Sequence, residues 1–255
     1  MRTWLPALVL ALGLGSAPAA AADLALPPSG VDWDYQLGGE RPVPDRVGIV
    51  VRDRTAEPLP ELYNVCYVNG FQTQPDERRF WRDHWRLVLK RHGDPVVDGS
   101  WGEWLLDIRT ASKRRALARI VGRWTDGCAE DGFAAVEYDN LDSFTRSRGL
   151  LTRADARAYA EKLVARAHAA GLAAAQKNRA QWDGTVVGYD FAIAEQCAQY
   201  DECGDYVDTY GDHVLSVEYT RGSYRKACRD WGDQLPVLRR DVALRVDGTR
   251  RWCAS

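Results

Sequence analysis

The amino-acid sequence predicts an α/β fold, a (β/α)8 TIM-type barrel formed by a single domain. Two observations lead to this prediction. Short runs rich in β-branched and aromatic residues alternate with amphipathic helical stretches, as in parallel strands joined by right-handed crossovers. Polar residues also recur at the C-terminal ends of these runs, where a parallel barrel carries its functional side chains. A doubly wound sheet would need a Gly-rich turn after its first strand, and the only G-x-G pair, Gly13 and Gly15, lies in the leader segment.

The first 22 residues have the features of a secretory signal peptide. Arg2 supplies a positive charge, residues 4–15 are mainly apolar, and residues 17–22 are small, with an A-x-A pattern. The apolar run is shorter than the roughly 20 residues of a membrane span. We therefore divide the chain into a signal peptide, residues 1–22, and a barrel domain, residues 23–255. We expect the mature protein to be extracellular and free of the membrane.

The composition narrows the classes of partner and cofactor. The formal net charge is −2, so we expect no nucleic-acid partner. The four histidines are dispersed and no C-x-x-C pair occurs, so we expect no metal site and no cofactor. The chain length suits one barrel, and we expect a monomer.

Six cysteines in an exported chain predict three disulfides. The sequence alone permits many pairings. We expect Cys197 to pair with Cys203 and close a short loop, and Cys228 to pair with Cys253 and attach the C-terminal segment. Cys66 and Cys128 remain as the third pair.

Nine runs have the length and composition of β-strands and are bounded by Gly, Asp, Asn or Pro. They are Trp33–Leu37, Val47–Arg52, Val65–Asn69, Trp104–Ile108, Ala134–Asp139, Leu172–Gln176, Phe191–Glu195, Val214–Tyr219 and Pro236–Arg240. A barrel of this type has eight strands, so one of the nine is an extra or edge strand.

Three segments between these runs have helical patterns. Apolar residues fall on one face of Glu77–Arg91 and recur at three- and four-residue steps in Ala111–Trp124. Thr152 and Asp155 have the spacing of a capping box for a helix that stops at Gly171.

Polar or charged residues end most of the predicted strands, and this pattern places the functional site at the C-terminal mouth of the barrel. They are Asp34, Gln36, Arg52, Asp53, Asn69, Asp107, Arg109, Glu137, Asp139, Asn140, Gln176, Lys177, Asn178, Glu195 and Glu218. Glu137 and Asp139 are two residues apart on one strand, so they should point to the same side, with Asp139 nearer the mouth.

The residue types favour carboxylate chemistry at this mouth. The sequence lacks a G-x-S-x-G elbow, a P-loop and an H-E-x-x-H motif, and the cysteines are expected to be oxidised. Two carboxylates across a cleft suit glycosidic bond cleavage. Aromatic residues suit the flat faces of sugars, and five of them lie in or just after strand ends: Trp101, Trp104, Tyr138, Trp182 and Tyr219.

The segments that carry these residues match a known family in order along nearly the whole mature chain. They are residues 33–37 (WDYQL), 66–72 (CYVNGFQ), 106–109 (LDIR), 132–143 (GFAAVEYDNLDS), 176–178 (QKN), 194–195 (AE) and 217–220 (VEYT). The sequence thus resembles glycoside hydrolase family 114, whose characterised activity is endo-α-1,4-polygalactosaminidase. That family is similar to other sugar-cleaving TIM barrels.

The resemblance implies Asp139 as the nucleophile and Glu195 as the acid/base. Glu137 and Glu218 are the nearest rivals, and Glu218 is the second choice for the acid/base. Further substrate-binding candidates are Asp34, Tyr67, Asp107, Arg109, Glu137, Tyr138, Asn140, Lys177, Asn178, Glu218 and Tyr219.

The implied substrate is an α-1,4-linked galactosamine-containing polysaccharide, cleaved internally outside the cell. A mouth lined by acidic side chains would attract such a cationic polymer, and the expected ones are Asp34, Asp107, Asp139, Glu195 and Glu218. The alternatives are a non-catalytic carbohydrate-binding barrel and a glycosidase for a different exopolysaccharide. A third alternative, a metal-dependent polysaccharide deacetylase, needs a His/Asp metal cluster, which the four dispersed histidines do not provide. The sequence leaves retention or inversion of configuration open, and we favour retention.

Overall fold

A computed structural model describes residues 24–254 of the chain. The predicted signal peptide, residues 1–22, lies outside the described residues. No helix within residues 24–254 is both long and apolar enough to span a membrane.

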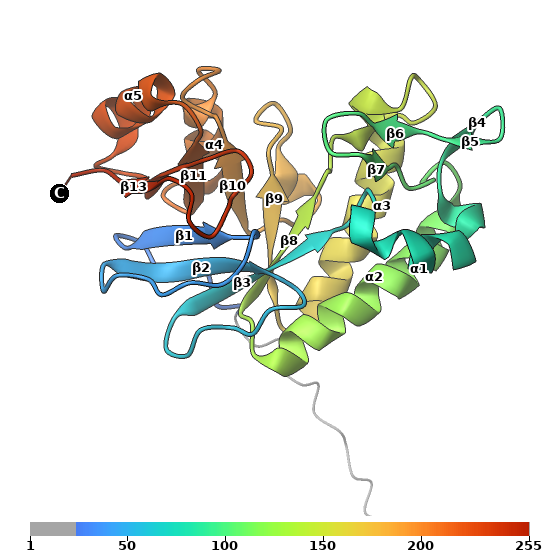
Figure 1. The fold of residues 1–255 in the computed structure, drawn as a ribbon, viewed down its shortest axis with the longest axis horizontal. Helices are drawn as coiled ribbons and strands as arrows, with labels where there is room; N and C mark the ends of the chain where they lie inside the picture. The colour runs from blue at the N-terminus through green and yellow to red at the C-terminus, as the bar shows by residue number, and fades with distance from the viewer. Residues whose placement is uncertain (1–23, 255) are drawn as a thin grey trace, which may run out of the picture.

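One nine-stranded sheet forms the body of the molecule (Figure 1). In spatial order its strands are β1 (Asp32–Gln36), β2 (Val47–Asp53), β3 (Tyr63–Asn69), β8 (Ala135–Asp139), β9 (Ala173–Lys177), β10 (Phe191–Glu195), β11 (Val214–Glu218), β12 (Val237–Arg240) and β13 (Arg250–Trp252). The strands from β1 to β12 pair in parallel, while β13 pairs antiparallel with β12.

Side chains of two tryptophans close the sheet into a barrel between β1 and β12. The indole of Trp33 donates to the carbonyl oxygens of Ser216 (3.2 Å) and Pro236 (3.0 Å). The indole of Trp252 on β13 donates to the carbonyl oxygen of Trp33 (2.7 Å). The predicted barrel is therefore confirmed, as a nearly closed sheet rather than a continuous hydrogen-bonded cylinder.

The predicted barrel strand Trp104–Ile108 is wrong. β3 pairs directly with β8, and the chain between them leaves the barrel to form two small hairpins (Figure 1). The strands of these hairpins are β4 (Lys90–Arg91), β5 (Asp94–Pro95), β6 (Val97–Asp98) and β7 (Glu103–Trp104). Because Trp104 pairs with Val97 in the second hairpin, it is not available to a barrel neighbour. The extra strand of the sheet is instead β13, which the sequence pattern did not predict.

Within residues 24–254, four α-helices of eight or more residues pack outside the barrel. They are α2 (Ala111–Asp131), α3 (Arg153–Ala169), α4 (Cys203–Tyr210) and α5 (Arg221–Trp231). The predicted capping box is present, since the Thr152 side chain accepts from the backbone of Asp155 and the Asp155 carboxylate accepts from the backbone of Thr152. Within the described residues, the segments 37–46 and 54–62, which connect β1 to β2 and β2 to β3, contain no helix. Strands and helices therefore alternate less regularly than predicted.

The helix predicted over Glu77–Arg91 is much shorter in the structure. It consists of α1 (Arg78–Asp83) between the 3-10 turns η1 (Pro75–Glu77) and η2 (Trp85–Leu87). Backbone pairing competes with the helix, because the carbonyl oxygen of Leu87 accepts from Asp107 (2.7 Å) and the amide of Leu89 donates to Leu105 (2.8 Å). Two further 3-10 turns, η3 (Ser143–Arg146) and η4 (Gly184–Val186), follow β8 and β9.

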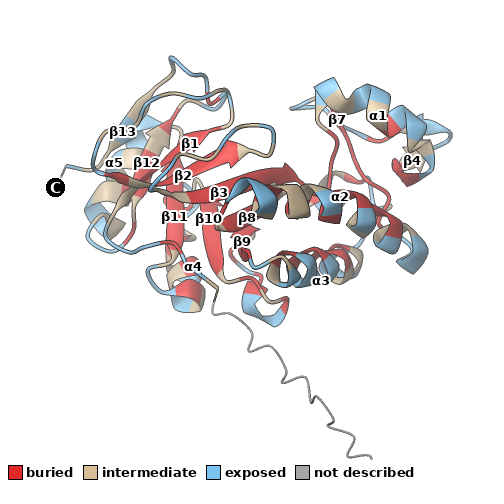
Figure 2. Cartoon of the chain, turned by 90° about the horizontal axis from the view of Figure 1, so that it is seen from below, coloured by how far each residue is buried: buried red, intermediate tan, exposed pale blue. Residues whose placement is uncertain are grey.

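Alternation along the strands creates two hydrophobic cores. Strands β1–β3 and β8–β12 are mostly buried, whereas the outer faces of α2 and α3 are exposed (Figure 2). The interior of the barrel is filled by every second strand residue, including Trp33, Tyr35, Ile49, Val51, Val65, Ala135, Ala173, Ala175, Phe191, Ile193, Leu215, Val217 and Leu238. The residues between them face the helices and form the second core.

All three predicted disulfides are present. Cys66–Cys128 joins β3 to α2, Cys197–Cys203 closes the loop before α4, and Cys228–Cys253 joins α5 to the C-terminal segment.

Candidate active site

A cleft of about 410 Å³ opens at the C-terminal mouth of the barrel. Its floor is made by inward-facing residues at or near the C-terminal ends of the strands. These residues are Tyr67 (β3), Asp139 (β8), Lys177 (β9), Glu195 (β10) and Tyr219 (after β11). They follow the same alternation as the apolar layer beneath them, so the strand pattern that builds the core also aims these side chains into the cleft.

Both carboxylate oxygens of Asp139 accept hydrogen bonds. The hydroxyl of Tyr67 donates to Oδ2 (2.8 Å) and the backbone amide of Asn140 donates to Oδ1 (2.7 Å). The ammonium group of Lys177 lies 3.5 Å from Oδ1. This arrangement fixes the carboxylate at the mouth, with one face open to the cleft.

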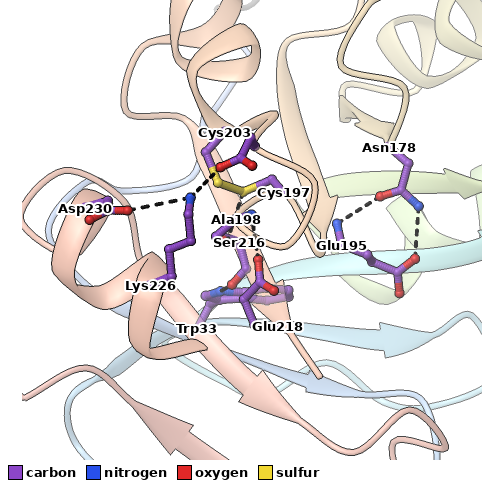
Figure 3. Close-up of a disulfide and its surroundings, with 11 residues drawn as sticks. Trp33, Asn178, Glu195, Cys197, Ala198, Cys203, Ser216, Glu218, Lys226 and Asp230 are labelled. Atoms are coloured by element: carbon purple, nitrogen blue, oxygen red, sulfur yellow. Dashed lines mark hydrogen bonds and ion pairs between the residues drawn. A yellow bond between two sulfur atoms is a disulfide. The ribbon is translucent and has the colours of Figure 1, made fainter. Parts of the chain in front are cut away.

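Glu195 is held in a similar way from the other side of the cleft. The side-chain amide of Asn178 donates to Oε2 (2.9 Å), and the backbone amide of Glu195 donates to the side-chain oxygen of Asn178 (2.8 Å) (Figure 3). The hydroxyl of Tyr219 donates to Oε1. Lys177 Nζ lies 3.8 Å from Oε2, so one lysine faces both carboxylates.

Lys177 and Glu137 form a buried pair below these two carboxylates. Nζ lies 2.6 Å from Oε1 of Glu137 and 2.7 Å from the hydroxyl of Tyr35, which also donates to Oε1 (2.8 Å). Burial raises the pKa of Glu137 to about 7, although Lys177 acts in the opposite direction. Burial alone would lower the pKa of Lys177, but the charges of Asp139, Glu137 and Glu195 outweigh it and keep this pKa well above its ordinary value.

The β6–β7 hairpin forms one wall of the cleft. It contributes Asp98, Ser100, Trp101 and Glu103, and the Trp101 side chain is 54% exposed. Arg146 joins this wall to the barrel, since its guanidinium lies 2.8 Å from Asp98 and donates to the Asn140 side chain (3.0 Å). The opposite wall includes Leu37, Gly38 and residues 242–244.

The family model for glycoside-hydrolase family GH114 matches residues 14–255. The chain belongs to glycoside-hydrolase family GH114. No match was found among the curated proteins.

Solved structures share the fold of this GH114 enzyme. The structure of Aspergillus fumigatus Ega3 in complex with galactosamine aligns with a TM-score of 0.72 at 21% identity, covering 92% of this chain and 99% of that one. The glycoside hydrolase domain of PelA from Pseudomonas aeruginosa aligns with a TM-score of 0.58 at 15% identity, covering 86% of this chain and 97% of that one. The enzyme is thus a glycoside hydrolase with the barrel fold of these proteins.

Seven of the predicted site residues line the cleft of the GH114 enzyme: Tyr67, Asp139, Asn140, Lys177, Asn178, Glu195 and Tyr219. Glu137 lies directly behind Lys177. The expectation that Glu137 and Asp139 share a side agrees with the structure, since both approach the same lysine nitrogen.

The structure does not bring the other predicted residues to the cleft. Glu218 faces the opposite side of β11, where it accepts a hydrogen bond from the backbone amide of Ala198 (2.8 Å) near the Cys197–Cys203 disulfide (Figure 3). Tyr138 faces the helices, and its hydroxyl contacts Thr125 (2.8 Å). Both residues occupy the outward positions of their strands, which explains why they miss the mouth.

Asp34, Asp107 and Arg109 also lie outside the cleft. Asp34 is an outward residue of β1 and pairs with Arg250 (2.7 Å). Asp107 pairs with Arg109 (2.7 Å) and with Lys113 at the start of α2. These three residues therefore have structural ion-pair partners in place of a substrate.

The acidic mouth exists, but most of its carboxylates differ from those predicted. Only Asp139 and Glu195 of the expected five line the cleft, and Asp98, Glu103 and Asp142 take the other places. Asp98 and Glu103 were missed because the hairpin that carries them was not predicted. Its signal was present in the two glycines, Gly99 and Gly102, that bracket its turn.

Within residues 24–254, no group of three or more His, Cys, Asp or Glu side chains is arranged to hold a metal ion.

Proposed function

We propose that this GH114 enzyme is a secreted endo-acting hydrolase of α-1,4-linked galactosamine-containing polysaccharide, with Asp139 as nucleophile and Glu195 as acid/base. The observation that carries the proposal is the convergence of these two carboxylates on one atom. Oδ1 of Asp139 and Oε2 of Glu195 lie 3.5 Å and 3.8 Å from Nζ of Lys177. The two oxygens are therefore separated by no more than the sum of these distances.

We propose that this reaction proceeds with retention of configuration at the anomeric carbon. Carboxyl groups about 5–5.5 Å apart suit retention, whereas inversion uses about 6.5–9.5 Å to admit a water molecule. Asp139 attacks the anomeric carbon while Glu195 gives its proton to the leaving oxygen, which forms a glycosyl-enzyme ester. Glu195 then takes a proton from water, and the resulting hydroxide displaces Asp139 from the sugar.

The charge of the cleft supports a cationic substrate. Its lining contains five carboxylates, from Asp98, Glu103, Asp139, Asp142 and Glu195, and two cations, from Arg146 and Lys177. Such an acidic cleft attracts a polymer that carries ammonium groups. The galactosamine bound in the similar Ega3 structure and the resemblance to polygalactosaminidases point to the same sugar.

Export is part of the proposal. The predicted signal peptide and the three disulfides both suit an oxidising compartment outside the cytoplasm.

Cleavage of polygalactosamine by the mature chain and three variants tests the proposal. We expect the wild type to release oligosaccharides, and Asp139→Asn and Glu195→Gln to lose activity by about 100-fold or more. Glu218→Gln is the matched control, because it changes a buried carboxylate outside the cleft and should retain activity. NMR of the reaction identifies the anomer that is released first, and release of the α-anomer from the α-linked polymer indicates retention. Wild-type inactivity on aminosugar polymers, or full activity of both cleft variants, would contradict the proposal.

A further inference from the structure

The carboxylates of the cleft differ in how they are neutralised. Asp139 and Glu195 share Lys177. Asp98 and Asp142 both pair with Arg146, at 2.8 Å each. Among the described residues, no lysine, arginine or histidine lies within ion-pair distance of the fifth carboxylate, Glu103 on β7.

Glu103 nevertheless has a fixed position. Its side chain is held by neutral donors: the amide of Asn140 donates to Oε2 (3.2 Å), and the amide of Gln72 donates to the same oxygen (3.1 Å) in the orientation that satisfies both ends of that amide. Within residues 24–254, the hydrogen bonds to this carboxylate at normal distance both end on Oε2, and the side chain of Asn69 lies near enough to favour its charged form. The residue is only 9% exposed, and the surface that remains lies in the cleft.

We propose that Glu103 is a specificity-determining residue that accepts the ammonium group of an aminosugar in the cleft. The inference rests on the proposed function and names which carboxylate recognises the amine. Asn140 directly follows Asp139, so an ammonium group on Oε1 of Glu103 belongs to a sugar close to the reacting bond. A neutral N-acetyl group would leave this carboxylate without a cation.

The electrostatics of Glu103 agree with this role. Burial raises its pKa to about 7 and the charges of Asp139 and Asp98 add to the rise, while the Asn69 side chain and the charge of Arg146 oppose it. A cation bound at Oε1 favours the ionised carboxylate and lowers this pKa. Near neutral pH, ammonium binding should therefore release a proton, whereas binding of a neutral sugar should not.

The test is calorimetric titration of the wild-type enzyme with galactosamine, N-acetylgalactosamine and galactose, which contain no glycosidic bond to cleave. Glu103→Gln should weaken galactosamine binding by about tenfold or more while leaving galactose binding within about twofold. Glu103→Asp keeps the charge and should retain part of the preference. Glu161→Gln, an exposed change on α3, is the control and should alter nothing. Buffers of different ionisation enthalpy report the proton released with galactosamine.

Three outcomes would overturn the inference. They are galactosamine binding no tighter than galactose, an equal loss for all three sugars in Glu103→Gln, and no change in Glu103→Gln. An equal loss would indicate a purely structural role for the side chain. Failure of the wild type to cleave polygalactosamine would instead overturn the proposed function, because the binding measurement does not depend on turnover.

Discussion

The ammonium nitrogen of Lys177 lies 2.6 Å from Oε1 of Glu137, and the two side chains are 2% and 0% exposed. The same nitrogen approaches Asp139 and Glu195. Oε2 of Glu137 has no hydrogen-bond partner among the described residues. The lysine therefore compensates the charge of a carboxylate that water cannot reach, and it sets the electrostatic environment of the two residues above it.

Replacement of Lys177 should show how strongly the stability of the fold depends on a cation beside Glu137. Lys177→Met leaves Glu137 buried without a cation, so the free energy of unfolding at pH 8 should fall by about 3–5 kcal/mol in urea titrations. The loss should be smaller at pH 5, where Glu137 can take up a proton. Glu137→Gln added to Lys177→Met should restore part of the stability. If the double variant is as unstable as the sum of the two single variants, the pair is not coupled.

The pKa of Glu103 predicts how stability changes with pH. The folded-state pKa is about 7 and the ordinary value is 4.5, so the folded enzyme binds more protons between these values than the unfolded chain does. Stability contributed by this group is therefore lost as pH rises from about 4.5 to about 7. Glu103→Gln should raise the Tm at pH 8 and leave it unchanged at pH 4. If the Tm of Glu103→Gln changes with pH in the same way as the Tm of the wild type, the expectation is wrong.

The three disulfides should contribute unequally to stability. They close 62, 25 and 6 residues of chain for Cys66–Cys128, Cys228–Cys253 and Cys197–Cys203. Loop entropy predicts losses of about 4, about 3.5 and about 2 kcal/mol on paired replacement by alanine. Guanidinium unfolding of the three double variants gives the order. A reversed order would show that strain or residual structure in the unfolded chain dominates.

Trp101 on the β6–β7 hairpin should act as a platform for a sugar ring. Because its side chain is 54% exposed, Trp101→Ala should leave the Tm unchanged while raising the KM for polygalactosamine several-fold at a nearly constant kcat. Trp104→Ala is the contrasting variant, because Trp104 is 8% exposed and its removal should cost about 3–5 kcal/mol of stability. Unchanged KM in Trp101→Ala would exclude the platform.

Strand periodicity predicted the barrel because its signal is local: eight of the nine predicted runs are strands of the barrel in the structure, β1–β3 and β8–β12. The ends of those strands also identified Asp139, Lys177 and Glu195. The pattern of polar residues at strand ends did not distinguish side chains that face the barrel interior from those that face outward. Glu218 ends a strand as visibly as Glu195 does, and Asp34 lies within one, but both face away from the barrel interior. Assigning the alternation on each strand from its apolar neighbours would have excluded both.

The misassigned segment at Trp104–Ile108 has a different cause. Its composition suits a strand, but its partners lie in a local hairpin and in isolated bridges with Gln72 and Val88. Pairing partners depend on the path of the whole chain, which local propensity does not contain. The same error concealed Asp98 and Glu103.

Because the β6–β7 hairpin sits in an excursion between β3 and β8, the side chains that would choose the sugar belong to a different stretch of chain from those that would break its linkage. Transplanting residues 97–104 from a relative with another sugar preference is thus a direct engineering route. Such a graft should redirect the enzyme to a new polymer without rebuilding Asp139, Lys177 and Glu195.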